Sequence, residues 1–128
     1  MHKVWLADDD EAIRIVLEES LKNSGYATST FSNASDLIEE LNSDTPDLII
    51  TDVHMPGMHG YDLLKHINNN HSELPVIIMT AFADMQAAVD SYGSGAFEYI
   101  PKPFDLDETI KIVQRALEKK PSTRGLKT

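Results

Sequence analysis

The sequence predicts a doubly wound α/β fold built on a five-stranded parallel sheet. Short strand-like runs alternate five times with segments whose apolar residues recur at helical spacing. Three of these runs, VWLA, LIIT and VIIM, are apolar throughout, as expected of parallel strands that helices cover on both faces. Because crossovers between parallel strands are right-handed, the alternation favours strand order 2-1-3-4-5 in a three-layer sandwich with five helices.

The predicted strands and helices follow one another in strict alternation. The strands span 3–7, 27–31, 48–51, 76–79 and 98–100. The first helix is expected at 11–24, where Gly25 readily adopts the left-handed conformation that closes a helix. Its apolar stripe comprises Ile13, Val16, Leu17 and Leu21. The other helices are expected within ASDLIEELN, GYDLLKHINN, ADMQAAVDSYG and LDETIKIVQRALEKK.

The composition is that of one globular domain with its own core. Of 128 residues, 41% are hydrophobic and 25% are charged, which is ordinary for a soluble fold. The absence of cysteine excludes disulfides and thiolate metal sites and fits a reducing compartment. No apolar run approaches the roughly 20 residues of a membrane span, and the N-terminus lacks a signal-peptide pattern. We therefore expect a cytoplasmic protein.

The charge and the C-terminal residues narrow the possible partners. A formal net charge of -10 repels phosphate backbones, so we expect no direct binding of nucleic acid by this domain. We assign residues 1–119 to the domain and residues 120–128, which contain Pro121, Ser122 and Gly125, to a linker or tail. Such a tail is expected to lead to an effector domain outside this chain.

Acidic residues follow two strands that are neighbours in the predicted sheet. Asp8, Asp9 and Asp10 follow the first strand, and Asp52 follows the third. Ligands of open parallel sheets bind outside the carboxyl ends of the strands, where these crossovers diverge. Like charges at that point repel, so a hard divalent cation is expected there, Mg²⁺ in preference to Ca²⁺ because few protein ligands are offered. Read alone, the acidic triplet could instead be a turn and a helix N-cap.

A hydroxyl and an ammonium group follow the fourth and fifth strands. Thr80 comes after VIIM, and Lys102 comes after the fifth strand in YIPKPF. Together with Mg²⁺, these groups could neutralise and position a phosphoryl group. Asp52 is the better candidate nucleophile, because it stands alone at its strand end while the acids of the first strand hold the cation.

Four motifs in this order and spacing resemble the receiver domain of two-component response regulators. They are ADDD, ITDVHMPGMHGYDLL, VIIMTAFAD and GAFEYIPKPFD, and the resemblance runs from residue 3 to about residue 119. Within the family, the chain looks most like the NtrC group of nitrogen-regulation activators of sigma-54 polymerase. The resemblance implies a flavodoxin-like fold and a phosphoacceptor switch rather than an enzyme, since such a domain catalyses only its own phosphorylation and dephosphorylation.

The resemblance also implies roles for individual residues. Asp52 is expected to accept the phosphoryl group. Mg²⁺, for which Mn²⁺ could substitute, is expected on Asp8, Asp9, Asp52 and the backbone carbonyl of His54, and the part of Asp10 stays open. Thr80 and Lys102 are expected to contact the phosphoryl group. Tyr99 is either the aromatic switch that follows Thr80 or an ordinary edge-strand tyrosine.

The expected partners follow from the same resemblance. A sensor histidine kinase donates the phosphoryl group, and the face of the fourth helix, fifth strand and fifth helix is the output surface. That face is also the expected site of a homodimer. In the NtrC group a receiver precedes an ATPase domain and a DNA-binding domain, so transcriptional control is implied by kinship.

The peptide bond between Lys102 and Pro103 is predicted to be cis. The segment PKPF must reverse direction before the last helix, and a cis bond makes the tight turn that aims the lysine at Asp52. The cost of cis over trans before proline is only about 0.5 to 1 kcal/mol. Receivers with this Lys-Pro pair commonly have it cis, so the resemblance favours the same form.

Three other functions and one other metal site fit parts of the sequence. A haloacid-dehalogenase-type phosphatase would need D-x-D-x-T after the first strand, where Ala12 occupies the fifth position. A flavodoxin-like FMN carrier would need a phosphate loop in place of the three acids. A stand-alone signalling shuttle remains open. His54 and His59 beside Asp52 could be read as zinc ligands, but HMPGMHG resembles an exposed turn.

Overall fold

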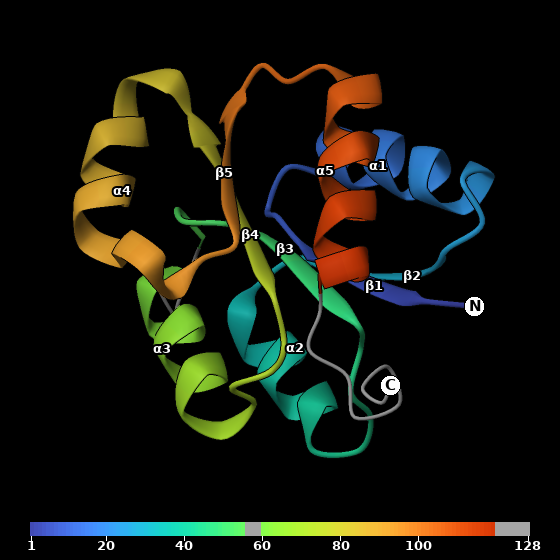
Figure 1. Ribbon diagram of the computed structural model, residues 1–128, viewed down its shortest axis with the longest axis horizontal. Helices are drawn as coiled ribbons and strands as arrows, with labels where there is room; N and C mark the ends of the chain where they lie inside the picture. The colour runs from blue at the N-terminus through green and yellow to red at the C-terminus, as the bar shows by residue number, and fades with distance from the viewer. Residues whose placement is uncertain (56–59, 120–128) are drawn as a thin grey trace.

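The computed structural model describes residues 1–55 and 60–119, and its centre is one parallel sheet (Figure 1). The strand order is β2-β1-β3-β4-β5, which confirms the predicted topology. The strands are β1 (Lys3–Ala7), β2 (Ala27–Phe31), β3 (Leu48–Asp52), β4 (Val76–Ala81) and β5 (Glu98–Lys102). The helices are α1 (Glu11–Asn23), α2 (Ala34–Leu41), α3 (Gly60–Asn70), α4 (Met85–Tyr92) and α5 (Leu106–Lys119), with short 3-10 turns at Phe82–Asp84 and Gly93–Gly95.

Helices cover both faces of the sheet, as Figure 1 shows. α1 and α5 lie on one face, and α2, α3 and α4 lie on the other. Successive strand residues point to opposite faces, so Val4 and Leu6 pack beneath α1 and α5 while Trp5 and Ala7 pack on the other side. Burial on both faces explains why the central strands are apolar throughout, and it leaves their carboxyl ends as the place where polar residues can gather.

Three strands extend farther than the apolar runs indicated. β3 includes Asp52, β4 continues through Thr80, and β5 continues to Lys102. The extra residues stay in register with a neighbouring strand, since Asp52 pairs with Met79 and Thr80 pairs with Pro101. Backbone pairing therefore carries these polar side chains on the ends of the strands themselves, which holds them more firmly than a loop would.

The first helix also differs in detail from the expectation. α1 ends at Asn23, Ser24 caps it, and Gly25 has the predicted left-handed backbone with φ of 94°. Leu17 and Leu21 are buried, but the prediction that Val16 belongs to the same stripe is wrong, because its side chain is 42% exposed. Val16 immediately precedes Leu17, and one residue along a helix turns the side chain by about 100°.

Two groups of expectations lie outside the described residues. The linker or tail at 120–128 is one, and His59, the second histidine of the zinc alternative, is the other. Among the helices that the structure describes, none combines the length and the apolar character that crossing a lipid bilayer requires.

Candidate functional site

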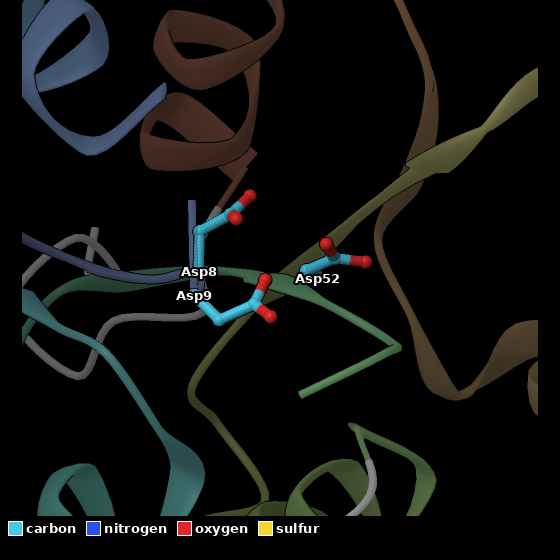
Figure 2. Close-up of side chains that lie close together, drawn as sticks. All are labelled: Asp8, Asp9 and Asp52. Atoms are coloured by element: carbon cyan, nitrogen blue, oxygen red, sulfur yellow. The ribbon is translucent and has the colours of Figure 1, made fainter. Parts of the chain in front are cut away.

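Three carboxylates meet at the carboxyl ends of β1 and β3. Ala7 pairs with Thr51 in the parallel register, so the next residue of each chain segment, Asp8 and Asp52, emerges at the same edge of the sheet. Figure 2 shows the side chains of Asp8, Asp9 and Asp52 lying close together there. One carboxylate oxygen from each lies within 4.8 Å of the others. We call these three residues the acidic site.

Asp8 is the fully buried member of the acidic site. Its backbone N–H donates to the carbonyl of Phe31 at 3.0 Å, and its Oδ1 accepts from the backbone N–H of Asp10 at 2.9 Å. Its Oδ2 accepts from Lys102 Nζ at 2.8 Å. Burial raises the pKa of the Asp8 carboxyl above its usual 3.8, although Lys102 and the Asp10 N–H act in the opposite direction. Asp8 is therefore held rigidly, at an electrostatic cost that its partners only partly offset.

Lys102 is the cation that the structure places among the acids. It ends β5, and its Nζ lies 2.8 Å from Oδ2 of Asp8 and 2.8 Å from Oδ2 of Asp52. Burial alone would lower the pKa of this lysine, but its hydrogen bonds to Asp52 and Asp8 outweigh burial and raise the pKa. The peptide bond between Lys102 and Pro103 is cis, as the sequence indicated.

Asp52 lies at the centre of the arrangement and keeps a small exposed surface. The residue is 7% exposed, and its Oδ1 accepts from the backbone N–H of His54 at 3.2 Å. Its Oδ2 accepts from Lys102. The His54 side chain points elsewhere, with Nε2 3.5 Å from Oδ2 of Asp84. Asp52 is thus oriented from both oxygens at a position that a small reagent can reach.

The other two strand-end acids differ sharply from each other. Asp9 is exposed and contributes to the acidic site. Asp10 is the N-cap of α1, where its Oδ1 accepts from the backbone N–H of Ala12 at 2.9 Å. The helix-cap interpretation of the acidic triplet therefore holds for Asp10. Of the three residues in the triplet, Asp8 and Asp9 belong to the acidic site.

Thr80 and Tyr99 lie on the same face of the sheet. Thr80 is completely buried, and within the described residues its Oγ1 is a buried side-chain atom without a hydrogen-bond partner. Tyr99 pairs with Ile78, two residues before Thr80, and packs partly buried against the core on the α2, α3 and α4 side. Its hydroxyl donates to the carbonyl of Gly93 at 2.6 Å, and burial raises its pKa.

Sequence reasoning missed one residue that contacts the acidic site. Arg14, in the first turn of α1, donates from Nη1 to the backbone carbonyl of Asp8 at 2.6 Å. A cation one helical turn after an acidic cluster is the signal that could have drawn attention to it. Its reach to a backbone oxygen depends on a rotamer that spacing does not reveal.

The donor set of the acidic site suits a hard divalent cation. Three carboxylate groups offer oxygen ligands, and two of them already converge on an ammonium group. Mg²⁺ binds through one or two carboxylates and keeps several waters, so a partly exposed cluster of this kind fits it better than a site that needs a full protein cage. Zn²⁺ would favour nitrogen and sulfur ligands, which are not among the three.

Comparisons with known proteins agree with the geometry. The family model described as response regulator receiver domain matches residues 4–114. The DNA-binding transcriptional regulator NtrC of Escherichia coli (strain K12) is 52% identical over 114 residues, which cover 89% of this chain and 24% of that protein. The chain therefore spans about a quarter of the length of the curated relatives it matches.

Solved structures give the same result at the level of the fold. The apo receiver domain of nitrogen regulatory protein C, solved in solution, has a TM-score of 0.84 and 50% identity, covering 91% of this chain and 94% of that one. Response regulator TrrA from Thermotoga maritima, solved in complex with Mg²⁺-BeF, has a TM-score of 0.82 and 29% identity, covering 91% and 99%. The strand order, the acidic site and these matches lead to one conclusion: the chain belongs to the response regulator receiver domain family.

Proposed function

We propose that this chain is a phosphoacceptor switch in which Asp52 receives a phosphoryl group from a histidine of a sensor kinase. The observation that carries the proposal is the position of Asp52. It lies at a strand end between two further carboxylates and the ammonium group of Lys102, and it keeps a small exposed surface. An exposed acid on a loop would have none of these neighbours, so the arrangement favours a reacting carboxylate over a structural one.

Asp8, Asp9, Asp52 and the backbone carbonyl of His54 would hold Mg²⁺ in this function, and Mn²⁺ could replace it. When bound, the ion supplies positive charge that neutralises phosphoryl oxygens during transfer. The Mg²⁺-BeF complex of the Thermotoga relative supports this choice of metal. Asp10 takes no part, because its carboxylate caps α1.

The transfer itself needs little covalent chemistry from the chain. An Asp52 carboxylate oxygen attacks the phosphorus of the phosphohistidine, an O–P bond forms, the N–P bond breaks, and the electron pair returns to the imidazole nitrogen of the kinase. Lys102 forms an ion pair with Asp52 before transfer and then contacts the transferred group, since its ammonium already lies 2.8 Å from the carboxylate. Hydrolysis of the acyl phosphate at the same site returns the domain to its starting state.

Thr80 and Tyr99 would report the phosphoryl group to the surface. A phosphoryl group on Asp52 offers acceptor oxygens, and the Thr80 hydroxyl is buried with no partner among the described residues. Movement of Thr80 changes the packing of Tyr99 on the same face and so biases the surface of α4, β5 and α5 between two states.

That surface is where we place the effector contact and the contact with a second copy of the chain. The relatives are named DNA-binding transcriptional regulators, and this chain covers about a quarter of their length. We therefore propose that it controls ATPase and DNA-binding domains of a longer cytoplasmic protein.

Phosphorylation with a small phosphodonor tests the proposal. Incubation with acetyl phosphate and Mg²⁺ should add a single phosphoryl group, and Asp52→Asn should abolish the addition without unfolding the domain. Asp62→Asn, the same change at an exposed acid of α3, should leave it intact. Peptide mapping that finds the label on any residue other than Asp52 would refute the mechanism. Phosphate release without accumulation of a phosphorylated form of the chain would indicate a phosphatase instead.

A further inference from the structure

Arg14 contacts the acidic site without being one of its carboxylates. Its Nη1 donates to the backbone carbonyl of Asp8 at 2.6 Å, and its own backbone N–H donates to the carbonyl of Asp10 at 3.1 Å. The side chain is half-buried against the segment that joins β1 to α1. One residue therefore contacts both ends of the turn that carries the strand-end acids.

The oxygen that Arg14 contacts belongs to the peptide group that precedes Asp9. The carbonyl of Asp8 belongs to the rigid peptide plane between Asp8 and Asp9, so a bond to this oxygen restrains the rotation of the plane. The remaining polar groups of Asp8 are held by Phe31, Asp10 and Lys102. With Asp8 fixed and the plane restrained, fewer directions are open to the Asp9 side chain where it leaves the backbone. Asp9 is exposed, so without that restraint its carboxylate is free to turn into water.

We propose that Arg14 is a positioning residue that, through the Asp8 carbonyl, holds the Asp9 carboxylate toward Asp52 so that the acidic site can bind Mg²⁺. The inference rests on the proposed function, because it takes the acidic site to be the Mg²⁺ site. It also predicts the direction in which Mg²⁺ affinity changes when Arg14 is replaced. A nearby cation repels Mg²⁺, so if Arg14 acted only through its charge, its removal would strengthen binding. If Arg14 positions Asp9, its removal weakens binding.

The Mg²⁺ dissociation constant, measured by NMR titration of the intact chain, separates the two roles. Residues that orient metal ligands typically change affinity about 10- to 100-fold when they are replaced. Because Arg14 acts through one backbone plane, we expect Arg14→Gln to weaken Mg²⁺ binding about tenfold, near the lower end of that range. Lys22→Gln removes the same charge from the far end of α1 and is the matched control, for which we expect unchanged or slightly stronger binding.

Two further variants keep the inference open to refutation. Arg14→Lys retains the charge and a hydrogen-bond donor, so its Mg²⁺ affinity should stay within about threefold of that of the wild type. This variant also tests the proposal if Arg14→Gln does not fold. In an Asp9→Asn background the carboxylate to be positioned is gone, and Arg14→Gln should then change affinity by less than about twofold.

Each alternative outcome has a defined meaning. Equal or tighter Mg²⁺ binding by Arg14→Gln, a tenfold loss in Arg14→Lys, or a further tenfold loss in the Asp9→Asn background would overturn the role of Arg14. Absence of Mg²⁺ binding by the wild type would instead overturn the proposed function, and the two failures are therefore distinguishable.

Discussion

Two groups of residues at the carboxyl end of the sheet differ in how completely their buried polar atoms are hydrogen-bonded. Asp8 and Asp52 with Lys102 form the group that we call the paired side of the site, and Thr80 forms the unpaired side. At the ends of β1 and β3, both oxygens of Asp8 and both oxygens of Asp52 accept hydrogen bonds, two of them from Lys102. At the end of β4, the buried Thr80 hydroxyl is without a partner among the described residues. An unpaired buried hydroxyl costs about 1 to 3 kcal/mol. The carboxylate side is therefore assembled in advance, and the Thr80 side stands to gain a hydrogen bond when an acceptor arrives.

Removing Lys102 should have the largest effect, because it breaks the paired side. Lys102→Met leaves the buried carboxylates of Asp8 and Asp52 without their shared cation. Breaking a buried ion pair typically costs about 3 to 5 kcal/mol, and since the Lys102 side chain is 18% exposed we expect about 2 to 3 kcal/mol. Urea unfolding with a chelator present would measure the loss. Lys65→Met, at an exposed lysine of α3, is the control and should cost little.

Acidity should partly rescue the same variant. Burial raises the folded pKa of Asp8 above 3.8, so the folded state binds this proton more tightly, and the associated stability is present at low pH and is lost as the pH rises through the folded pKa. Lys102 opposes this shift, so the pKa of folded Asp8 should be higher still in Lys102→Met. As the pH rises above 3.8, the variant should therefore lose more stability than the wild type. Parallel stability curves for the two proteins would contradict this account of Asp8.

A smaller loss of stability is expected when Asp10, the helix cap beside the acidic site, is replaced. Asp10→Ala removes the carboxylate that accepts from Ala12 and Ile13 at the start of α1, which should cost about 1 kcal/mol of stability. Mg²⁺ affinity should change little, because the Asp10 side chain faces the helix rather than the acidic site. Chemical unfolding and an Mg²⁺ titration of the same variant test both statements. A large loss of Mg²⁺ affinity would mean that Asp10 takes part in binding the metal.

Both sides of the site were more predictable from sequence than the contacts that refine them. Asp8, Asp52, Thr80 and Lys102 could be placed together because carboxyl ends of adjacent parallel strands share one edge, and apolar runs locate the strands. The split between Asp9 and Asp10 was not predictable, since a helix cap and a metal ligand use the same residue type. The exposure of Val16 was also missed, because packing decides whether a residue at the edge of an apolar helix face is buried.

The smallest effect concerns Thr80 and tests the unpaired side of the comparison. Thr80→Val replaces a hydroxyl by a methyl group of similar size, and we expect stability to be unchanged or to rise by up to about 1 kcal/mol, because no hydrogen bond is lost. Thr51→Val is the matched control at another fully buried threonine of the sheet. The Thr51 hydroxyl donates to the Asp52 carbonyl at 2.9 Å, so valine there should cost about 1 kcal/mol or more. Urea unfolding of both variants without a phosphodonor measures the difference. Equal costs would mean that the Thr80 hydroxyl is paired in solution, and the contrast between the two sides of the site would then disappear.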